Sequence, residues 1–203
     1  MRPTVDDMTS TCVDHAVDIH DAVPVVLLDG GLATLRPLRD GEGGPQLSVL
    51  AAMSDASRLQ RFLTSMPIPP PAAVMRALAT LDEDLHAAWL ATVDGVPVGV
   101  ARWVRVSAEV AEVAFEVVDA HHGRGIGSLL LEAVTLDAVA HGVRRLRADV
   151  HPSNVASVRL LRQVGLELRL VDGLFSGESP IRLAPKLRQP ELRRLQDHRA
   201  PVG

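Results

Sequence analysis

A glycine-rich turn between a β-type segment and a helical segment constrains the fold of this chain more than any other feature. The segment AEVAFEVVDAHHGRGIGSLLLEAV is strand-like as far as Val118 and then carries glycines at positions 123, 125 and 127. Apolar residues follow at helical spacing, namely Ile126, Leu129, Leu130, Ala133, Leu136 and Ala140. Glycines allow a close backbone approach, and the N–H groups at a helix N-terminus bind anions such as phosphate. The segment therefore predicts a strand, a phosphate-binding turn and a helix.

The segments before this turn predict an antiparallel meander of three strands. His86–Val93 and Val96–Val106 flank Asp94-Gly95, a dipeptide typical of hairpin turns, and Glu109–Val118 follows after two residues. A dinucleotide-binding (Rossmann) fold does not fit, because its glycine motif lies in the first strand-to-helix turn of a parallel sheet. A P-loop does not fit either, because no Gly-Lys-Ser/Thr sequence ends the turn.

The rest of the chain predicts further strands and helices around the meander. Strands are expected at Leu32–Leu38, Arg144–Val150, Leu166–Val171 and Glu178–Leu183. Helices are expected from about Pro45 to Met53, from Ser54 as N-cap, from Pro71 through Leu81 and over Asn154–Val164. This order predicts an α+β fold, with a mixed central sheet of six to seven strands flanked by about four helices. One domain would span residues 23–184, between a flexible acidic leader (1–22) and a polar tail (185–203).

Composition narrows the class of protein. The formal net charge of −4 argues against nucleic acid or an anionic membrane as the main partner. No apolar run is long enough to span a bilayer, and the single cysteine, Cys12, cannot form an intramolecular disulfide. We therefore expect a cytoplasmic protein that acts without nucleic acid or membrane. His15 and His20 lie among aspartates in the leader, but a solvated tail explains them better than a metal site, so no metal is expected.

With these segments in place, the chain resembles the GNAT superfamily of acyl-CoA-dependent N-acyltransferases. The family motif Gln/Arg-x-x-Gly-x-Gly/Ala opens a long helix after the fourth strand. His122, Gly125 and Gly127 match its positions, with His122 in place of Gln or Arg. A second family motif, Asn-x-x-Ser/Ala at the start of a helix, matches Asn154 and Ser157. Within the superfamily, the chain is similar to bacterial protein lysine acetyltransferases.

The resemblance covers roughly residues 32–183 and implies acetyl-CoA as the acetyl donor and an amine as the acceptor. The residues implied to bind the coenzyme are Val117, Val118, His122, Gly123, Arg124, Gly125, Ile126, Gly127, Ser128, Asn154 and Ser157. In this family a bulge separates the strand before the motif from its neighbour, so that pantetheine can pair with the open edge. The acceptor groove would be formed by Leu47–Leu81 and the turn near Phe175. Similar proteins often form homodimers, which keeps a homodimer open for this chain.

The chemistry needs a group that removes a proton from the amine. A lysine-type amine has a pKa near ~10.4, so only about one molecule in a few thousand is unprotonated at pH 7. The resemblance assigns the role of base to Glu112, in the sequence AEVAF. Strand alternation puts Glu116 on the same face, either as a rival base or as a second carboxylate that raises the pKa of Glu112. In many family members a tyrosine protonates the leaving thiol; here Leu161 aligns with it, and the chain has no tyrosine.

Three functions stay open at this point. The first is acetyl transfer to a protein lysine side chain, and the second is acetyl transfer to a small-molecule amine. These share one chemistry and differ only in the acceptor groove. The third is a non-catalytic acyl-CoA-binding module, which the histidine at position 122 favours and the glutamate at position 112 opposes.

Overall fold

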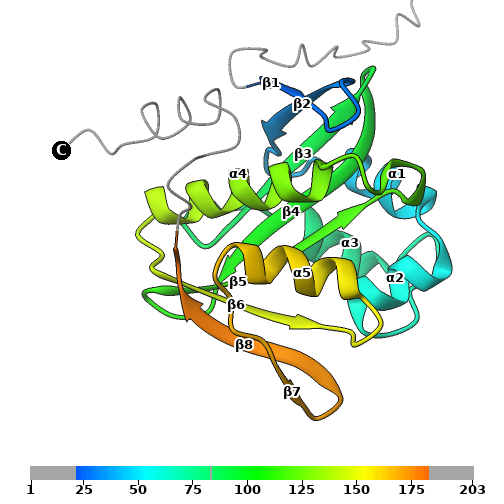
Figure 1. Cartoon of the computed structure of the whole chain (residues 1–203). Helices are drawn as coiled ribbons and strands as arrows, with labels where there is room; N and C mark the ends of the chain where they lie inside the picture. Colours follow the sequence, from blue (N-terminus) through cyan, green and yellow to red (C-terminus); the bar gives the residue numbers. More distant parts are fainter. Residues whose placement is uncertain (1–21, 83, 183–203) are drawn as a thin grey trace, which may run out of the picture.

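The computed structural model describes residues 22–82 and 84–182, and eight strands in this part form one sheet (Figure 1). Their order across the sheet is β1-β2-β3-β4-β5-β6-β8-β7. Neighbouring strands are antiparallel except β5 and β6, which are parallel. The strands are β1 (Val23–Val26), β2 (Leu32–Pro37), β3 (His86–Val93), β4 (Val96–Arg105), β5 (Val110–Val117), β6 (Arg145–Val150), β7 (Arg169–Val171) and β8 (Leu174–Pro180).

Five α-helices in the described ranges cover the two faces of this sheet. They are α1 (Gly43–Ala52), α2 (Asp55–Phe62), α3 (Ala72–Ala79), α4 (Ile126–Ala140) and α5 (Val155–Gln163). Helices α4 and α5 lie in front of the sheet in Figure 1, and their buried residues share one core with Trp89 and Trp103. Residues of α1, α2 and α3 build a second core with Leu90 and Val100. A short 3₁₀ helix, η2 (Asp119–His121), links β5 to the glycine-rich turn before α4.

The alternation of side chains along the central strands explains why two cores form. In β3, Trp89 and Ala91 belong to the core beneath α4, whereas Ala88 and Leu90 belong to the core beneath α1. Successive side chains of a strand point to opposite faces, so a strand that is apolar on both faces must be covered twice. The expected mixed sheet with helices on its faces is therefore confirmed.

The structure corrects the expected number and bounds of several elements. Eight strands and five α-helices replace the expected six to seven strands and about four helices. Strand β1 was not expected because it has only four residues and contains Pro24, which is tolerated here because β1 lies at the sheet edge. At the other edge of the sheet, Asp172-Gly173 forms the turn between β7 and β8, and both residues have a positive φ. Strand β8 therefore begins at Leu174, earlier than the expected Glu178.

The parallel pair β5 and β6 separates after a short stretch of pairing. Only Val110–Glu112 pairs with Arg145–Arg147, although β5 continues to Val117. The expected separation of β5 from its neighbour is thus observed, but the expected bulge in β5 is not, because β5 pairs with β4 without interruption from Ala111 to Val117. The register shift lies instead in β3, between Ala91 and Thr92. Strands β5 and β6 thus separate towards the glycine-rich turn, while β5 stays hydrogen-bonded to β4.

Some expectations fall outside the described residues. These are the tail (185–203), almost all of the leader (1–22), and with the leader Cys12, His15 and His20. Among the described helices, none is both long and apolar enough to cross a membrane. Within the same ranges, no group of three or more His, Cys, Asp or Glu side chains could hold a metal ion.

Candidate active site

A cavity of about 440 Å³ lies where β5 separates from β6. Five parts of the chain supply its walls: the turn between β1 and β2, α2 with Met53, the end of β5, the turn that leads into α4, and α5. The lining residues are Leu28, Met53, Ser57, Gln60, Arg61, Phe115, Glu116, Val117, His121, His122, Gly123, Gly125, Ile126, Gly127, Ser128, Asn154, Ala156, Ser157, Arg159, Leu160 and Gln163. The structure therefore brings most of the sequence-predicted residues to one place.

The glycine-rich turn is built to accept a phosphate group. Gly123 and Gly125 have φ of 76° and 90°, a region that other residues rarely adopt. Gly125 is the N-cap of α4, and no side chain caps this end of the helix. The first turn of the helix, at Ile126, Gly127 and Ser128, thus forms part of the cavity wall. Its N–H groups and the positive end of the helix dipole lie there. A pyrophosphate fits this donor set.

Gly127 leaves room that a side chain would fill. A Cβ atom at this position would stand 3.1 Å from Leu160 Cδ1 on α5. Both residues line the cavity, so any larger residue at 127 would narrow the space between α4 and α5.

The turn between β1 and β2 forms one wall of this cavity, which no sequence pattern predicted. The backbone N–H of Leu28 donates to the carbonyl oxygen of Arg124 at 3.0 Å. Asp29 forms an ion pair with Arg124 at 2.6 Å, which holds the pKa of the Asp29 carboxyl below its usual value. The Leu28 side chain lies against Gly125, lines the cavity and remains 73% exposed. Arg124 itself lies outside the lining because its guanidinium is bound to Asp29 and His121.

His122, which replaces the usual Gln or Arg, joins the turn to the end of β5. Its Nε2 lies 2.8 Å from the carbonyl oxygen of Val117, so the tautomer with a proton on Nε2 donates a hydrogen bond there. Val117 and His122 both line the cavity. Val118 does not, since its side chain is buried and its N–H donates to Val98.

Asn154 and Ser157 begin α5 and also line the cavity. The Asn154 side chain accepts a hydrogen bond from the Ser157 N–H at 3.0 Å, which is a helix N-cap. On the same helix, Leu160 lines the cavity whereas Leu161 is buried in the core. Leu161, the position that aligns with the family tyrosine, therefore does not line this cavity, and the neighbouring Leu160, which does, has no proton to donate either.

The two glutamates of β5 occupy different environments. The Glu116 side chain is fully buried at the cavity wall, where Oε1 accepts from Gln46 at 2.6 Å and Oε2 from Arg61 at 2.5 Å. Burial alone would raise the pKa of Glu116, but the charges of Arg61 and Arg102 and the two hydrogen bonds outweigh it and lower the pKa. Glu116 is therefore a carboxylate near neutral pH, with both oxygens engaged.

Glu112 is not among the residues that line the cavity. Its side chain is 44% exposed and lies 3.9 Å from Arg147 Nε, at the last paired position of β5 and β6. Of the two carboxylates, only Glu116 lines the cavity, and both of its oxygens already accept hydrogen bonds. The assignment of Glu112 as the base stays a prediction.

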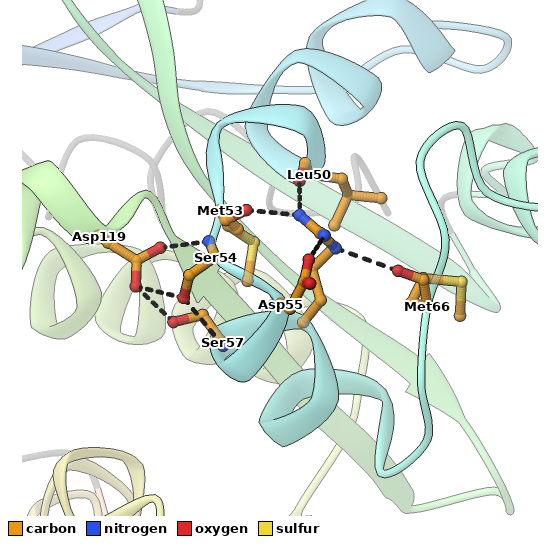
Figure 2. Close-up of polar contacts among 8 residues, drawn as sticks. Leu50, Met53, Ser54, Asp55, Ser57, Met66 and Asp119 are labelled. Atoms are coloured by element: carbon orange, nitrogen blue, oxygen red, sulfur yellow. Dashed lines mark hydrogen bonds and ion pairs between the residues drawn. The ribbon is translucent and has the colours of Figure 1, made fainter.

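Helix α2 is fixed at its N-terminus by two sets of contacts, drawn in Figure 2. Asp119, in η2, accepts hydrogen bonds from the Ser54 N–H at 2.8 Å, the Ser54 hydroxyl at 2.9 Å and the Ser57 hydroxyl at 2.6 Å. The buried Arg58 pairs with Asp55 and donates to the carbonyl oxygens of Leu50, Met53 and Met66. These contacts hold Ser57, Gln60 and Arg61 against the cavity.

The sequence predicted the α2 side of the cavity only as a range, and it did not single out most of the α5 side. The expected acceptor groove, Leu47–Leu81, does contribute Met53, Ser57, Gln60 and Arg61, but Phe175 lies outside the lining. Arg159, Leu160 and Gln163 follow the Asn154 motif at helical spacing, which is the one signal that could have identified them.

The comparison with known proteins decides the family. A family model described as "Acetyltransferase (GNAT) family" matches residues 56–166, more than half of the chain. The chain belongs to the GNAT family of acetyltransferases. The glycine-rich turn, residues 123–127, lies within the matched range.

Relatives of known identity agree with this assignment. Acetyltransferase Pat from Mycolicibacterium smegmatis is 33% identical over 147 residues, which are 70% of this chain and 44% of the relative. The chain therefore spans less than half the length of that relative. The GNAT domain of PAT from S. lividans superposes with a TM-score of 0.73 at 30% identity, over 80% of this chain and 98% of that one.

A more distant structure shares the fold. It is a GNAT phosphinothricin acetyltransferase from Sinorhizobium meliloti, solved in complex with AcCoA. It is 19% identical and has a TM-score of 0.55, over 73% of this chain and 88% of that one. The GNAT fold of this chain is thus confirmed, and at least one protein with the same fold binds acetyl-CoA.

Proposed function

We propose that this protein transfers the acetyl group of acetyl-CoA to the side-chain amine of a lysine in another protein. One observation carries the proposal: a single cavity connects the phosphate-binding turn of α4 with solvent-exposed side chains on α5. Ala156, Arg159 and Gln163 are exposed at this rim, so an acceptor that remains attached to a large molecule can reach the cavity from outside. A long, unbranched lysine side chain suits that approach.

The residues that line the cavity would bind different parts of acetyl-CoA. Acetyl-CoA supplies the thioester whose carbonyl carbon the amine attacks, with loss of the thiolate. The N–H groups of Ile126, Gly127 and Ser128 would hold the pyrophosphate, while Asn154 and Ser157 would lie along the pantetheine. Val117 lies at the end of β5 where the strand edge is open, so it would contact the pantetheine amides.

Glu112 is the proposed base, acting through water. It faces the same side of β5 as Glu116, and it is half-exposed with one charged neighbour at 3.9 Å. Glu116 suits this role less, because its pKa is lowered and both oxygens already accept hydrogen bonds. A base that receives the ammonium proton contributes about 10²–10⁴ in rate.

The experiment that tests the function is an acceptor panel. Release of coenzyme A from acetyl-CoA is measured with folded proteins, lysine peptides and small amines, and mass spectrometry locates the acetyl group. We expect release that depends on the acceptor and an acetyl group on lysine Nε. Transfer to small amines alone would make the protein a small-molecule acetyltransferase. Binding of acetyl-CoA without transfer to any amine would overturn the catalytic role.

A further inference from the structure

Arg61 is held at the cavity wall by contacts on two sides. Its Nε donates to Glu116 Oε2 at 2.5 Å, and its guanidinium lies 5.0 Å from the centre of the Phe62 ring. The side chain is only 15% exposed and lines the cavity. Among the described residues, the two Nη groups of Arg61 have no hydrogen-bond partner. They are thus donors fixed in place without an acceptor.

The charges around Arg61 do not cancel. Glu116 lies between two arginines, Arg61 and the buried Arg102, which donates to the oxygen of Gln46. Burial lowers the pKa of Arg102 to about 10, which still leaves it protonated at neutral pH. Two cations therefore face one carboxylate. Among the lining residues, Glu116 is the only acidic one, whereas Arg159 adds a further positive charge.

Such a wall disfavours a lone ammonium and favours an anion. Like charges in a partly buried site repel each other more than they do in water. Coenzyme phosphates are not the obvious partner of Arg61, because the phosphate-binding turn begins at Gly123, on a different wall from α2. The planar guanidinium matches a carboxylate, with two parallel N–H donors.

We infer that Arg61 binds a carboxylate that the acceptor carries close to its reactive amine, with Glu116 as the residue that positions Arg61. In a protein acceptor this carboxylate is an acidic side chain beside the lysine, and in a small acceptor it is the acid group of an amino acid. The inference rests on the proposed function and adds the acceptor's chemistry to it. The carboxylate offsets the positive charge of the wall while the amine enters the cavity.

Two matched lysine peptides test the inference. They differ only in a Glu or a Gln beside the lysine, and kcat/KM is measured for both. We expect the wild-type protein to prefer the Glu peptide about tenfold, mainly through KM, as for one charge-assisted hydrogen bond. Arg61→Gln should abolish this preference and leave coenzyme A affinity unchanged, since Glu116 keeps Arg102 and Gln46 as partners.

Arg162→Gln is the matched control. Arg162 lies on α5 near the Phe175 ring and is not among the lining residues, so this variant should keep the preference. The inference is overturned if Arg61→Gln retains the preference, if the wild type shows none, or if Arg61→Gln weakens coenzyme A binding instead.

A second pair of acceptors separates this inference from the proposed function. If no lysine peptide is acetylated, lysine transfer fails, and β-alanine is then compared with propylamine, which lacks the carboxylate. An Arg61-dependent preference for β-alanine would support the inference without a protein acceptor. Equal rates for the two amines would overturn it.

Discussion

Glu112 and Glu116 lie four residues apart on one face of β5, but their neighbours give them different chemistry. Glu116 is surrounded by Gln46, Arg61 and Arg102, which keep it ionised and hydrogen-bonded. Glu112 is half-exposed beside Arg147. A base must be able to take up a proton and release it to solvent, which the environment of Glu112 permits and that of Glu116 opposes.

Replacing each glutamate by glutamine separates these roles. Glu112→Gln should reduce kcat by about 10² or more at pH 7, because glutamine cannot accept the proton, and should leave acetyl-CoA affinity near normal. Glu116→Gln should act mainly through the acceptor KM, since it releases Arg61. The two variants are compared by steady-state kinetics. A severe kcat loss in Glu116→Gln with a mild one in Glu112→Gln would transfer the base role to Glu116.

His86 makes folding stability depend on pH. Burial, followed by the charge of Arg102, lowers the pKa of His86 from 6.5 to about 4. Between pH 6.5 and 4, the folded protein thus keeps His86 neutral, whereas His86 of the unfolded chain is protonated. The contribution of His86 to the free energy of unfolding is therefore fully present above pH 6.5 and is lost as the pH falls towards 4. The full pKa difference corresponds to about 3 kcal/mol, which solvent screening of this half-buried ring reduces to about 1–2 kcal/mol.

Urea unfolding at pH 6.5 and 5 measures this contribution. The free energy of unfolding should fall between these values in the wild type, and the fall should be smaller in His86→Asn. An equal fall in the free energy of unfolding between pH 6.5 and 5 in the two proteins would contradict the lowered pKa of His86.

At the scale of elements, the proposed binding of acetyl-CoA depends on the N-terminus of α4. Gly127→Val should place a side chain against Leu160 and into the cavity, and so abolish the thermal stabilisation by acetyl-CoA. In the wild type, ligand at a hundred times its dissociation constant adds about 2.7 kcal/mol.

Gly44→Val is the matched control for this prediction. Gly44 is likewise the second residue of its helix, α1, and a Cβ there meets no atom within 4 Å. This variant should keep the full acetyl-CoA shift in differential scanning fluorimetry. A folded Gly127→Val protein with the full shift would mean that the phosphate lies elsewhere.

Helix α2 depends on a residue that is distant in sequence. Asp119→Ala removes three hydrogen bonds from Ser54 and Ser57 and should lower the free energy of unfolding by about 1–2 kcal/mol. It should also raise the acceptor KM, because α2 carries Arg61. Glu109→Ala, which removes an exposed ion pair with Arg144, should change stability by less than about 0.5 kcal/mol. Equal losses in both variants would contradict the anchoring role of Asp119.

At the scale of the molecule, local patterns predicted many of the elements and several of the residues that line the cavity. The hairpin around Asp94-Gly95, the strand β6 and the helix α4 were confirmed almost to the residue, since each carries its own turn or periodicity signal. The glycines of the turn carry a local signal of the same kind, whereas Asn154 was singled out by the family resemblance, and these residues all line the cavity.

The individual contacts across the cavity could not be predicted, because they join distant segments of the chain. Arg61 meets Glu116 across 55 positions, and Ser54 meets Asp119 across 65. Leu28 reaches Gly125 only because the unexpected strand β1 pairs with β2 at the sheet edge. No local pattern encodes such pairs, so the sequence predicted the segment that contains α2 but not the residues that it contacts.

The central claim is that one cavity holds the acetyl donor and a lysine acceptor together. A conjugate in which an acetyl bridge joins the coenzyme A sulfur to the Nε of a lysine peptide tests it directly by calorimetric titration. Because the two halves would bind as one ligand, we predict affinity at least about a hundredfold above that of coenzyme A or the peptide alone. Gly127→Val should remove this gain. A conjugate that binds no more tightly than coenzyme A would contradict the claim.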